Sequence, residues 1–390
     1  MSTFVEILKA IGLAVLVFTF LAVVAAMFGV YMERKISGWI QARLGPKHVG
    51  PQGLLQTIAD TVKLLQKEHI TPRRADALIF NSAPIIVAVA GLLDWVVIPF
   101  GQVGSRYLVV RDINIGVVYF AAMASLTVIG ILAGGWASNN KYALLGGLRA
   151  ASQMISYEIP LALGILWAAM IAGSLSTVSL VEAQRGGWFM FKVPPFGLLA
   201  ALMFLTAATA EVNRVPFDLP EAESELVAGY FAEYTGMRFA LFQLGEYAEM
   251  FAFAALFSVL FLGGWDEPSL SRQWAWLWLV FGAGALAIAA FIQVRLRHVL
   301  LVRPIFILAV MAAVLSLILF LGVMAGRAQV LPSIVWFFVK MFTLVFFLMW
   351  MRWTYPRLRL DQLLNLSWKV LLPLGLLNLL ITGFIITVAR

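Results

Sequence analysis

Six acidic side chains lie close together in one short stretch of the sequence, residues 211–234, which reads EVNRVPFDLPEAESELVAGYFAEY. They are Glu211, Asp218, Glu221, Glu223, Glu225 and Glu233. Asp218 followed by Glu221 is typical of a helix N-terminal capping box, but capping uses only two of the six acids. Glu221 and Glu225 lie one helical turn apart, where like charges repel each other. We therefore expect these acids to share a partner or a proton.

The chain around this acidic segment is strongly apolar and carries net positive charge. Of its 390 residues 62% are hydrophobic and 12% are charged, the mean hydropathy is +0.93 and the formal net charge is +8. A soluble globule of this length needs far more polar surface. Its continuous apolar runs of about 20 residues predict transmembrane helices, since barrel strands are short and alternate.

We therefore predict an all-α polytopic membrane protein with a single membrane domain over residues 1–390. The predicted spans, about ten in number, lie near 11–31, 78–100, 113–133, 154–175, 195–212, 241–264, 274–292, 301–323, 333–351 and 369–388. Most of the 28 Lys and Arg residues fall in the connections after alternate spans, above all in 34–74. The positive-inside rule places these connections in the cytoplasm and both termini outside. Anionic lipid at the cytoplasmic face accounts for the positive charge, so we expect no nucleic-acid partner.

Several kinds of chemistry have no residues to support them. The chain has no cysteine, so we expect no iron–sulfur cluster on it. Its three histidines, His48, His69 and His298, all fall in predicted connections, where they cannot hold a haem between spans. No phosphate-binding loop, metal-ligand spacing or hydrolase triad is present in the sequence. We expect no redox cofactor, no metal site and no catalytic residue of the chain's own.

The connection over residues 33–76 is predicted to lie on the cytoplasmic membrane surface. It reads ERKISGWIQARLGPKHVGPQGLLQTIADTVKLLQKEHITPRRAD. Its second half predicts an interfacial amphipathic helix, because apolar residues recur there near helical spacing, namely Leu54, Leu55, Ile58, Ala59, Val62, Leu64 and Leu65. The glycines and prolines of RLGPKHVGPQG predict a rigid, tightly turned loop beside Arg43.

Residues 33–76 and 211–234 are part of a longer resemblance to a known family. Together with GWASNNKYALLGGLRAASQMISYEIPL and RWTYPRLRLDQLLNLSWKVLLPL, and in the same order, they resemble the quinone-chamber H subunit in the membrane arm of NADH:quinone oxidoreductase, respiratory complex I. The resemblance implies a subunit of the bacterial inner membrane that closes the floor and entrance of the quinone chamber. It also implies a link between quinone reduction and proton translocation.

The resemblance further implies a set of partners. They are hydrophilic-arm quinone-site subunits, small membrane subunits, antiporter-like subunits and membrane lipids. FMN and iron–sulfur clusters are expected on the partner subunits, and quinone is expected as substrate. The chain departs from the family pattern in two places. The family has about eight spans, whereas residues 266–332 predict an inserted helical hairpin, and Ser125 stands where some members have a glutamate.

The resemblance assigns eight residues to quinone binding: Arg34, Lys35, Trp39, Asp60, Lys63, Arg214, Phe217 and Asp218. Each charged group also has a simpler interpretation. Arg34 and Lys35 could be orientation charges that reach the lipid headgroups. Asp60 and Lys63 could form a surface ion pair. Arg214 could pair with Glu211, one turn back in the sequence.

Seven glutamates are candidates for a proton relay: Glu158, Glu211, Glu221, Glu223, Glu225, Glu233 and Glu246. We expect Glu158, Glu211 and Glu246 at or just inside the cytoplasmic ends of spans. An ionised acid at mid-bilayer costs roughly 3 kcal/mol, so acids in spans usually serve function. The simpler interpretation is an acid at headgroup depth or a partner of an arginine such as Arg149. Asp94 is expected at the outer membrane interface.

Two other classes of protein stay open on the sequence. One is a scaffold subunit of a ferredoxin- or hydrogenase-linked membrane complex, which shares the arginine-glycine-proline loop. The other is a stand-alone secondary transporter, which would show an internal repeat with broken helices in matching halves. The sequence has no such repeat, and the full PFDLPEAESELVAG segment favours the quinone enzyme.

Overall fold

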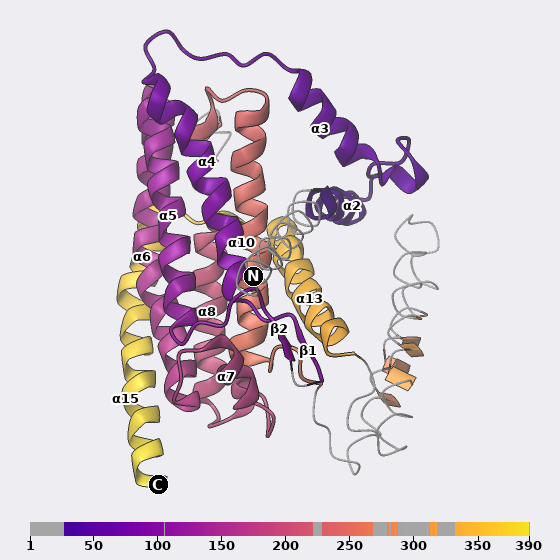
Figure 1. Ribbon diagram of the computed structural model, residues 1–390, viewed down its shortest axis with the longest axis vertical. Coiled ribbons are helices and arrows are strands. Elements are labelled where there is room, and N and C mark those ends of the chain that lie inside the picture. Colours follow the sequence, from indigo (N-terminus) through magenta and orange to yellow (C-terminus); the bar gives the residue numbers. More distant parts are fainter. Residues whose placement is uncertain are drawn as a thin grey trace, which may run out of the picture.

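Long apolar helices make up most of the structure, a computed structural model (Figure 1). It describes residues 27–104, 106–220, 228–267 and 332–389, with 279, 280, 282–284, 286, 287, 290, 310, 313, 314, 316 and 317. Within that part of the chain, six helical segments are long and apolar enough to cross a membrane: Ala77–Val97, Gly116–Ala137, Lys141–Ala172, Met237–Phe261, Ser333–Thr354 and Leu360–Val388. The all-α polytopic fold is therefore confirmed.

The predicted spans agree with helices of the structure to within a few residues, with two exceptions. The predicted span 195–212 matches Phe196–Glu211, an apolar helix that is shorter than these six. Helix α6 (Lys141–Ala172) begins far before the predicted residue 154, because Asn140 caps it and accepts a hydrogen bond from the backbone amide of Tyr142 at 2.9 Å. The last span is longer than predicted because α14 (Leu360–Asn365), the π-helical turn η7 (Leu366–Leu371) and α15 (Leu372–Ala389) follow without a break. The predicted first span and most of the 266–332 hairpin lie outside the described residues.

Five helices form the bundle that positions the buried polar groups. They are α4 (Ala77–Leu93), α5 (Gly116–Ala137), α6, α8 (Phe196–Glu211) and α10 (Met237–Phe261). Helix α10 packs against α4, α8 and α13 (Ser333–Thr354), and every residue from Gly245 to Phe261 is buried. Its aromatic side chains fill the core, where Phe253, Phe257 and Phe261 all contact Phe204 of α8.

The two ends of the bundle differ, and we name them by their helices. At the α3 end, helices α4, α6 and α10 begin, and the 3-10 turn η5 (Gly229–Phe231) packs on α6. The α7 end carries α7 (Thr177–Glu182), η4 (Phe189–Phe191) and the last turn of α15 (Figure 1). Helix α4 continues as the 3-10 turn η3 (Asp94–Val97) into a two-stranded antiparallel hairpin of β1 (Gly101–Val103) and β2 (Arg106–Leu108), with Gln102 opposite Tyr107.

Helices α2 (Val30–Ile40) and α3 (Gln56–Gln66), with the short turn η2 (Pro51–Gly53) between them, lie at the side of the bundle (Figure 1). The second half of this connection forms a helix, α3, as predicted. Three of its apolar side chains are exposed, namely Ile58 at 44%, Val62 at 45% and Leu65 at 58%. Thr235 ties the segment after α3 to the start of α10, because its hydroxyl accepts from the amide of Ile70 at 3.1 Å and donates to the Glu68 carbonyl at 3.1 Å. An exposed apolar face of this kind fits lipid or a partner subunit.

Candidate functional site

The predicted quinone residues on α2 and α3 lie at the surface of the chain. Arg34 forms an ion pair and hydrogen bond with Asp60, and Gln56 donates to the other Asp60 oxygen at 3.2 Å. The partner of Asp60 is therefore Arg34 from the other helix, so the predicted pair with Lys63 is replaced. Lys35 lies 5.7 Å from the Tyr31 ring, Trp39 is half-buried and Lys63 is exposed.

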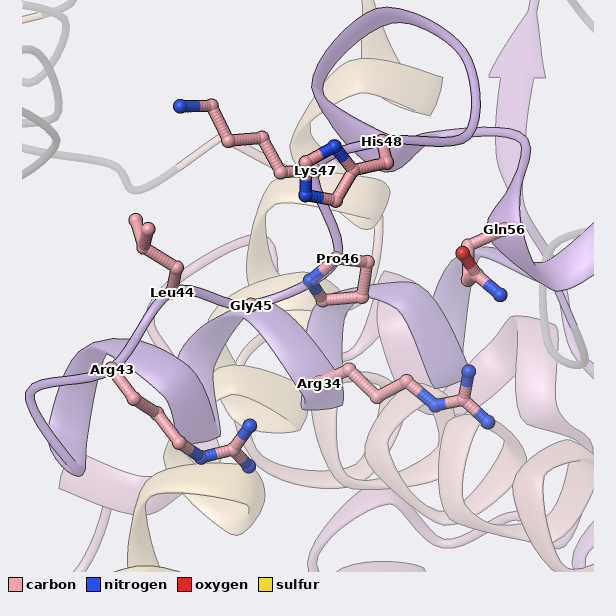
Figure 2. Close-up of a pocket in the computed structure, with 8 residues that line it drawn as sticks. All are labelled: Arg34, Arg43, Leu44, Gly45, Pro46, Lys47, His48 and Gln56. Carbon is pink, nitrogen blue, oxygen red and sulfur yellow. The ribbon is translucent and has the colours of Figure 1, made fainter.

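A basic pocket of about 410 Å³ lies where the glycine-proline loop turns back over α2. Figure 2 shows its lining, which combines cationic side chains with the loop backbone: Arg34, Arg43, Leu44, Gly45, Pro46, Lys47, His48 and Gln56. The loop is tightly packed, as predicted, because a Cβ on Gly53 would stand 2.3 Å from the Pro46 carbonyl oxygen. The backbone at Gly53 also has φ +79°, a conformation that favours glycine. The pocket therefore presents positive charge on a rigid frame.

A buried ion-pair hub joins four elements behind this surface. The Glu33 carboxylate of α2 accepts from Arg214 at 3.0 Å and from the Tyr247 hydroxyl of α10 at 2.5 Å, and its other oxygen pairs with Arg352 of α13. The Arg214 guanidinium also lies 4.6 Å from the Tyr247 ring centre. Burial acts to raise the pKa of the Glu33 carboxyl, but Arg214 and Arg352 outweigh it and hold that pKa below its ordinary value.

The hub corrects one interpretation made from the sequence. Arg214 pairs with Glu33, 181 residues away, and Glu211 is not among its ion-pair partners in the described chain. The reason is that the chain leaves the helix at Val212 and turns Arg214 toward α2. Glu33 was not among the predicted site residues, although it opens the quoted 33–76 segment. Its position directly before Arg34 and Lys35 is the signal that could have identified it.

The segment that carries Arg214 is buried along its length. Gln153 of α6 holds it, because one side-chain amide donates to the Ala210 carbonyl at 2.7 Å, to the Asn213 side chain at 3.0 Å and to the Phe217 carbonyl at 2.8 Å. Phe217 itself packs against the Tyr157 ring in the core. Asp218 forms an ion pair with Arg357 at 3.0 Å. This segment is a rigid connection between the hub and the bundle.

Three of the predicted relay glutamates lie inside the bundle. Glu211 ends α8 at 2% exposure, and one of its carboxyl oxygens has no hydrogen-bond partner among the described residues. Glu246 of α10 accepts from the Tyr230 hydroxyl, and Glu158 of α6 accepts from the Ser125 hydroxyl of α5. The expectation that Glu158 lies at a span end is wrong, because α6 extends thirteen residues further toward the α3 end than predicted and leaves Glu158 near its middle.

The other relay candidates are placed differently. Glu233 is half-buried and accepts from the Asn140 side chain at 2.6 Å, at the start of α6. Glu221, Glu223 and Glu225 lie outside the described residues. The acidic segment is therefore described only at its two ends.

Two further acids belong with this group, and sequence reasoning missed both. Glu249 of α10 is 2% exposed and accepts from the Thr127 hydroxyl. Asp94 was expected at the membrane interface, but its side chain is completely buried because η3 packs into α5 and α10. Glu249 lies within electrostatic range of both Asp94 and Glu211, and Glu211 lies within range of Glu158. The structure thus brings together four acids from four helical segments. The residues that the structure describes hold no cluster of His, Cys, Asp and Glu suited to a metal ion.

Comparison with known proteins decides between the classes left open above. The family model described as NADH dehydrogenase matches residues 12–303 and 297–383. The chain belongs to this family. Among its relatives, the H subunit of NADH-quinone oxidoreductase from Geobacillus kaustophilus is 44% identical over 94% of this chain and 91% of its own length. The corresponding H subunits from Brevibacillus brevis (41%; 92% and 88%) and Bacillus thuringiensis (42%; 96% and 93%) are similarly close. The chain is thus a membrane subunit of an enzyme complex, as the resemblance implied.

Proposed function

We propose that this NADH-quinone oxidoreductase subunit forms part of the wall and entrance of a quinone chamber and carries the first acids that respond to quinone reduction. The observation that carries the proposal is the short buried connection from Glu211 to Asp218. Within four residues this connection passes from a bundle acid, Glu211, to Arg214, a member of the Glu33 hub. Gln153 fixes both ends of the turn, so a change in charge at one end acts on the other through a rigid frame.

The hub has the properties of a chamber wall. Glu33 is one carboxylate shared by two guanidinium groups, so the hub carries one net positive charge when all three side chains are ionised. Arg352 keeps 27% of its side chain exposed and Arg34 keeps 47%, which leaves both able to meet a ligand at the side of the bundle. Cationic side chains beside a quinone favour its reduced, anionic forms.

The acids of the bundle can respond to the proton uptake that quinone reduction requires. Reduction of a quinone to a quinol consumes protons as well as electrons, so the reaction changes charge beside the hub. The buried Glu211 carboxyl lies within electrostatic range of the half-buried Glu158 carboxyl. A charge change at the hub therefore redistributes protons among them. The chain has no cysteine, so electrons are expected from FMN and iron–sulfur clusters on partner subunits.

The surface beside the chamber suits the remaining partners. The basic pocket of the glycine-proline loop fits an acidic surface of a hydrophilic-arm subunit. The exposed apolar face of α3 fits lipid, and we place the α3 end at the cytoplasm with both termini outside, in a bacterial inner membrane. Small membrane subunits and antiporter-like subunits are the expected lateral neighbours, to which the proton response passes.

Arginine variants in the intact complex test the chamber. Arg34→Ala and Arg214→Ala are each expected to lower the reduction of a long-tailed quinone at least several-fold and to weaken the binding of a quinone-site inhibitor. Electron transfer from NADH to an artificial acceptor, which bypasses quinone, reports the content of assembled complex. The matched control is Arg185→Ala, which removes an arginine from an exposed pair with Glu182 at the α7 end. Normal quinone reduction and inhibitor binding in both variants would show that these arginines are only topological charges.

Glutamine variants test the relay separately. Glu158→Gln, Glu211→Gln and Glu246→Gln keep the shape of each side chain but cannot carry a proton. In sealed vesicles each is expected to lower the number of protons pumped per electron. If all three variants assemble and pump the wild-type number of protons per electron, these acids serve only as structural partners.

A further inference from the structure

Asp94 is an acid that the proposed function does not yet use. Its side chain is 0% exposed, and neither carboxyl oxygen has a hydrogen-bond partner in the described part of the chain. A buried carboxyl without a partner costs several kcal/mol if it is charged. A side chain that serves packing alone would be apolar. The presence of a carboxyl at this buried position therefore needs an explanation other than packing.

Close helix packing places Asp94 beside Glu249. Gly91 lies one turn before Asp94, and a Cβ at Gly91 would stand 2.9 Å from the Gly245 carbonyl oxygen and 3.3 Å from Glu249 Cγ. At the next residue, the Trp95 indole donates to the Ala248 carbonyl at 3.3 Å. Glycine on both helices allows this approach, because any side chain at Gly91 or Gly245 would separate α4 from α10.

The groups around the pair come from every element packed on η3. Helix α4 has no titratable residue, α5 supplies Tyr119 and Thr127, and α10 supplies Glu249. Among the described residues, the carboxyls of Glu249 and Glu211 lie within electrostatic range of Asp94. A buried carboxyl without a hydrogen-bond partner favours its protonated form, so this pair is suited to hold a proton.

The positions of two α5 residues indicate which acid, Asp94 or Glu249, lies nearer the α7 end. Thr127 donates to Glu249, and Tyr119, two turns nearer the start of α5, lies within electrostatic range of Asp94. Helix α5 starts at the α7 end, and Tyr119 is half-buried. Asp94 therefore lies further toward the α7 end than Glu249, which itself neighbours Glu211.

We propose that Asp94 and Glu249 form a proton-holding site that extends the buried line of acids from Glu211 toward the α7 end. In the transfer step the O–H bond of a protonated Glu249 breaks, an O–H bond forms on the Asp94 carboxylate, and Glu249 is left ionised; no electrons move. The inference rests on the proposed function, since protons must first reach Glu211. The Asp94–Glu249 pair is then part of the proton path that quinone reduction drives.

Isosteric variants of both acids test the site in the intact complex, in sealed vesicles. Asp94→Asn and Glu249→Gln are each expected to reduce the protons pumped per electron at least twofold, and Asp94→Glu, which keeps an acid, is expected to retain pumping. Glu182→Gln, an acid in a surface pair at the α7 end, is the matched control. Acceptor activity that bypasses quinone reports complex content in each preparation.

Infrared difference spectra between the oxidised and the quinone-reduced complex give a readout that a structural role would not change. A band of protonated carboxyl that responds to reduction is expected in the wild type and is expected to be lost or shifted in Asp94→Asn and Glu249→Gln. Wild-type pumping with an unaltered band in these variants, while Glu211→Gln is impaired, overturns this inference and leaves the proposed function standing. Normal pumping in Glu211→Gln as well overturns both. If Asp94→Asn fails to assemble, Glu249→Gln decides by the same two measurements.

Discussion

Removing the Glu33 carboxylate should destabilise the chain far more than removing an acid from a surface pair. In Glu33→Ala the buried Arg214, which is 7% exposed, loses the Glu33 carboxylate, while the partly exposed Arg352 can turn toward solvent. Removing one member of a buried ion pair costs about 3–5 kcal/mol, because the other charge stays buried and loses that partner. The thermal midpoint of the purified complex should therefore fall by roughly 5–15 °C.

The assay follows the chain itself during heating of the complex. It measures quinone reductase activity and the fraction of this chain still associated after each temperature step. Asp60→Ala is the matched control, since it also removes a carboxylate from an arginine of α2, but that pair is exposed and is worth about 0–1 kcal/mol.

A double variant decides whether the buried Arg214 charge causes the loss of stability. Adding Arg214→Met to Glu33→Ala removes the buried guanidinium as well, and most of the lost stability should return. The reasoning is refuted if Asp60→Ala costs as much as Glu33→Ala, or if the losses of the two single variants simply add in the double variant.

Three other predictions concern the same framework. Lys340→Met should destabilise the chain by about 1–3 kcal/mol and expose the segment after α10 to protease, because the Lys340 ammonium donates to the carbonyls of Leu262, Gly264 and Asp266 at 2.6–2.9 Å. Gly91→Ala should cost about 1–3 kcal/mol in thermal unfolding, because its Cβ meets backbone at 2.9 Å. The stability advantage of the wild type over Glu33→Gln should be full above about pH 4.3, the ordinary pKa of a glutamate, and should be lost as the pH falls through the lowered folded-state pKa.

Each of these has a clear contrary result. Unchanged protease sensitivity in Lys340→Met would mean that its three carbonyls find other donors. Wild-type stability in Gly91→Ala would mean that α4 and α10 separate without cost. A stability difference that is the same at all pH values would mean that Glu33 does not act through its charge.

Orientation of the chain is a separate prediction, and the absence of cysteine makes it simple to examine. A cysteine replacing the exposed Tyr142, at the α3 end, should react with an impermeant thiol reagent only from the cytoplasmic side. A cysteine replacing the exposed Phe191, at the α7 end, should react only from outside. The opposite pattern would invert the topology proposed from the Lys and Arg distribution.

Much of this fold follows from local sequence. The span helices could be predicted because transfer into lipid depends on the side chains of one segment, whatever its neighbours are. The helical face of α3 could be predicted because the period of 3.6 residues is a local property. The start of α6 could not, because hydropathy detects the lipid-crossing part of a helix and α6 continues beyond it.

The sequence by itself thus determined which segments enter the membrane, and it indicated Glu211 and Glu246 as acids in apolar surroundings. Only the tertiary structure decided which groups meet. Glu33 and Arg214 are 181 residues apart, and Asp94 lies within electrostatic range of Glu249 where Gly91 packs against Gly245. The physical reason is that hydropathy and helical period specify the depth and face of a residue, whereas its partner depends on which helices pack together and how closely their backbones approach.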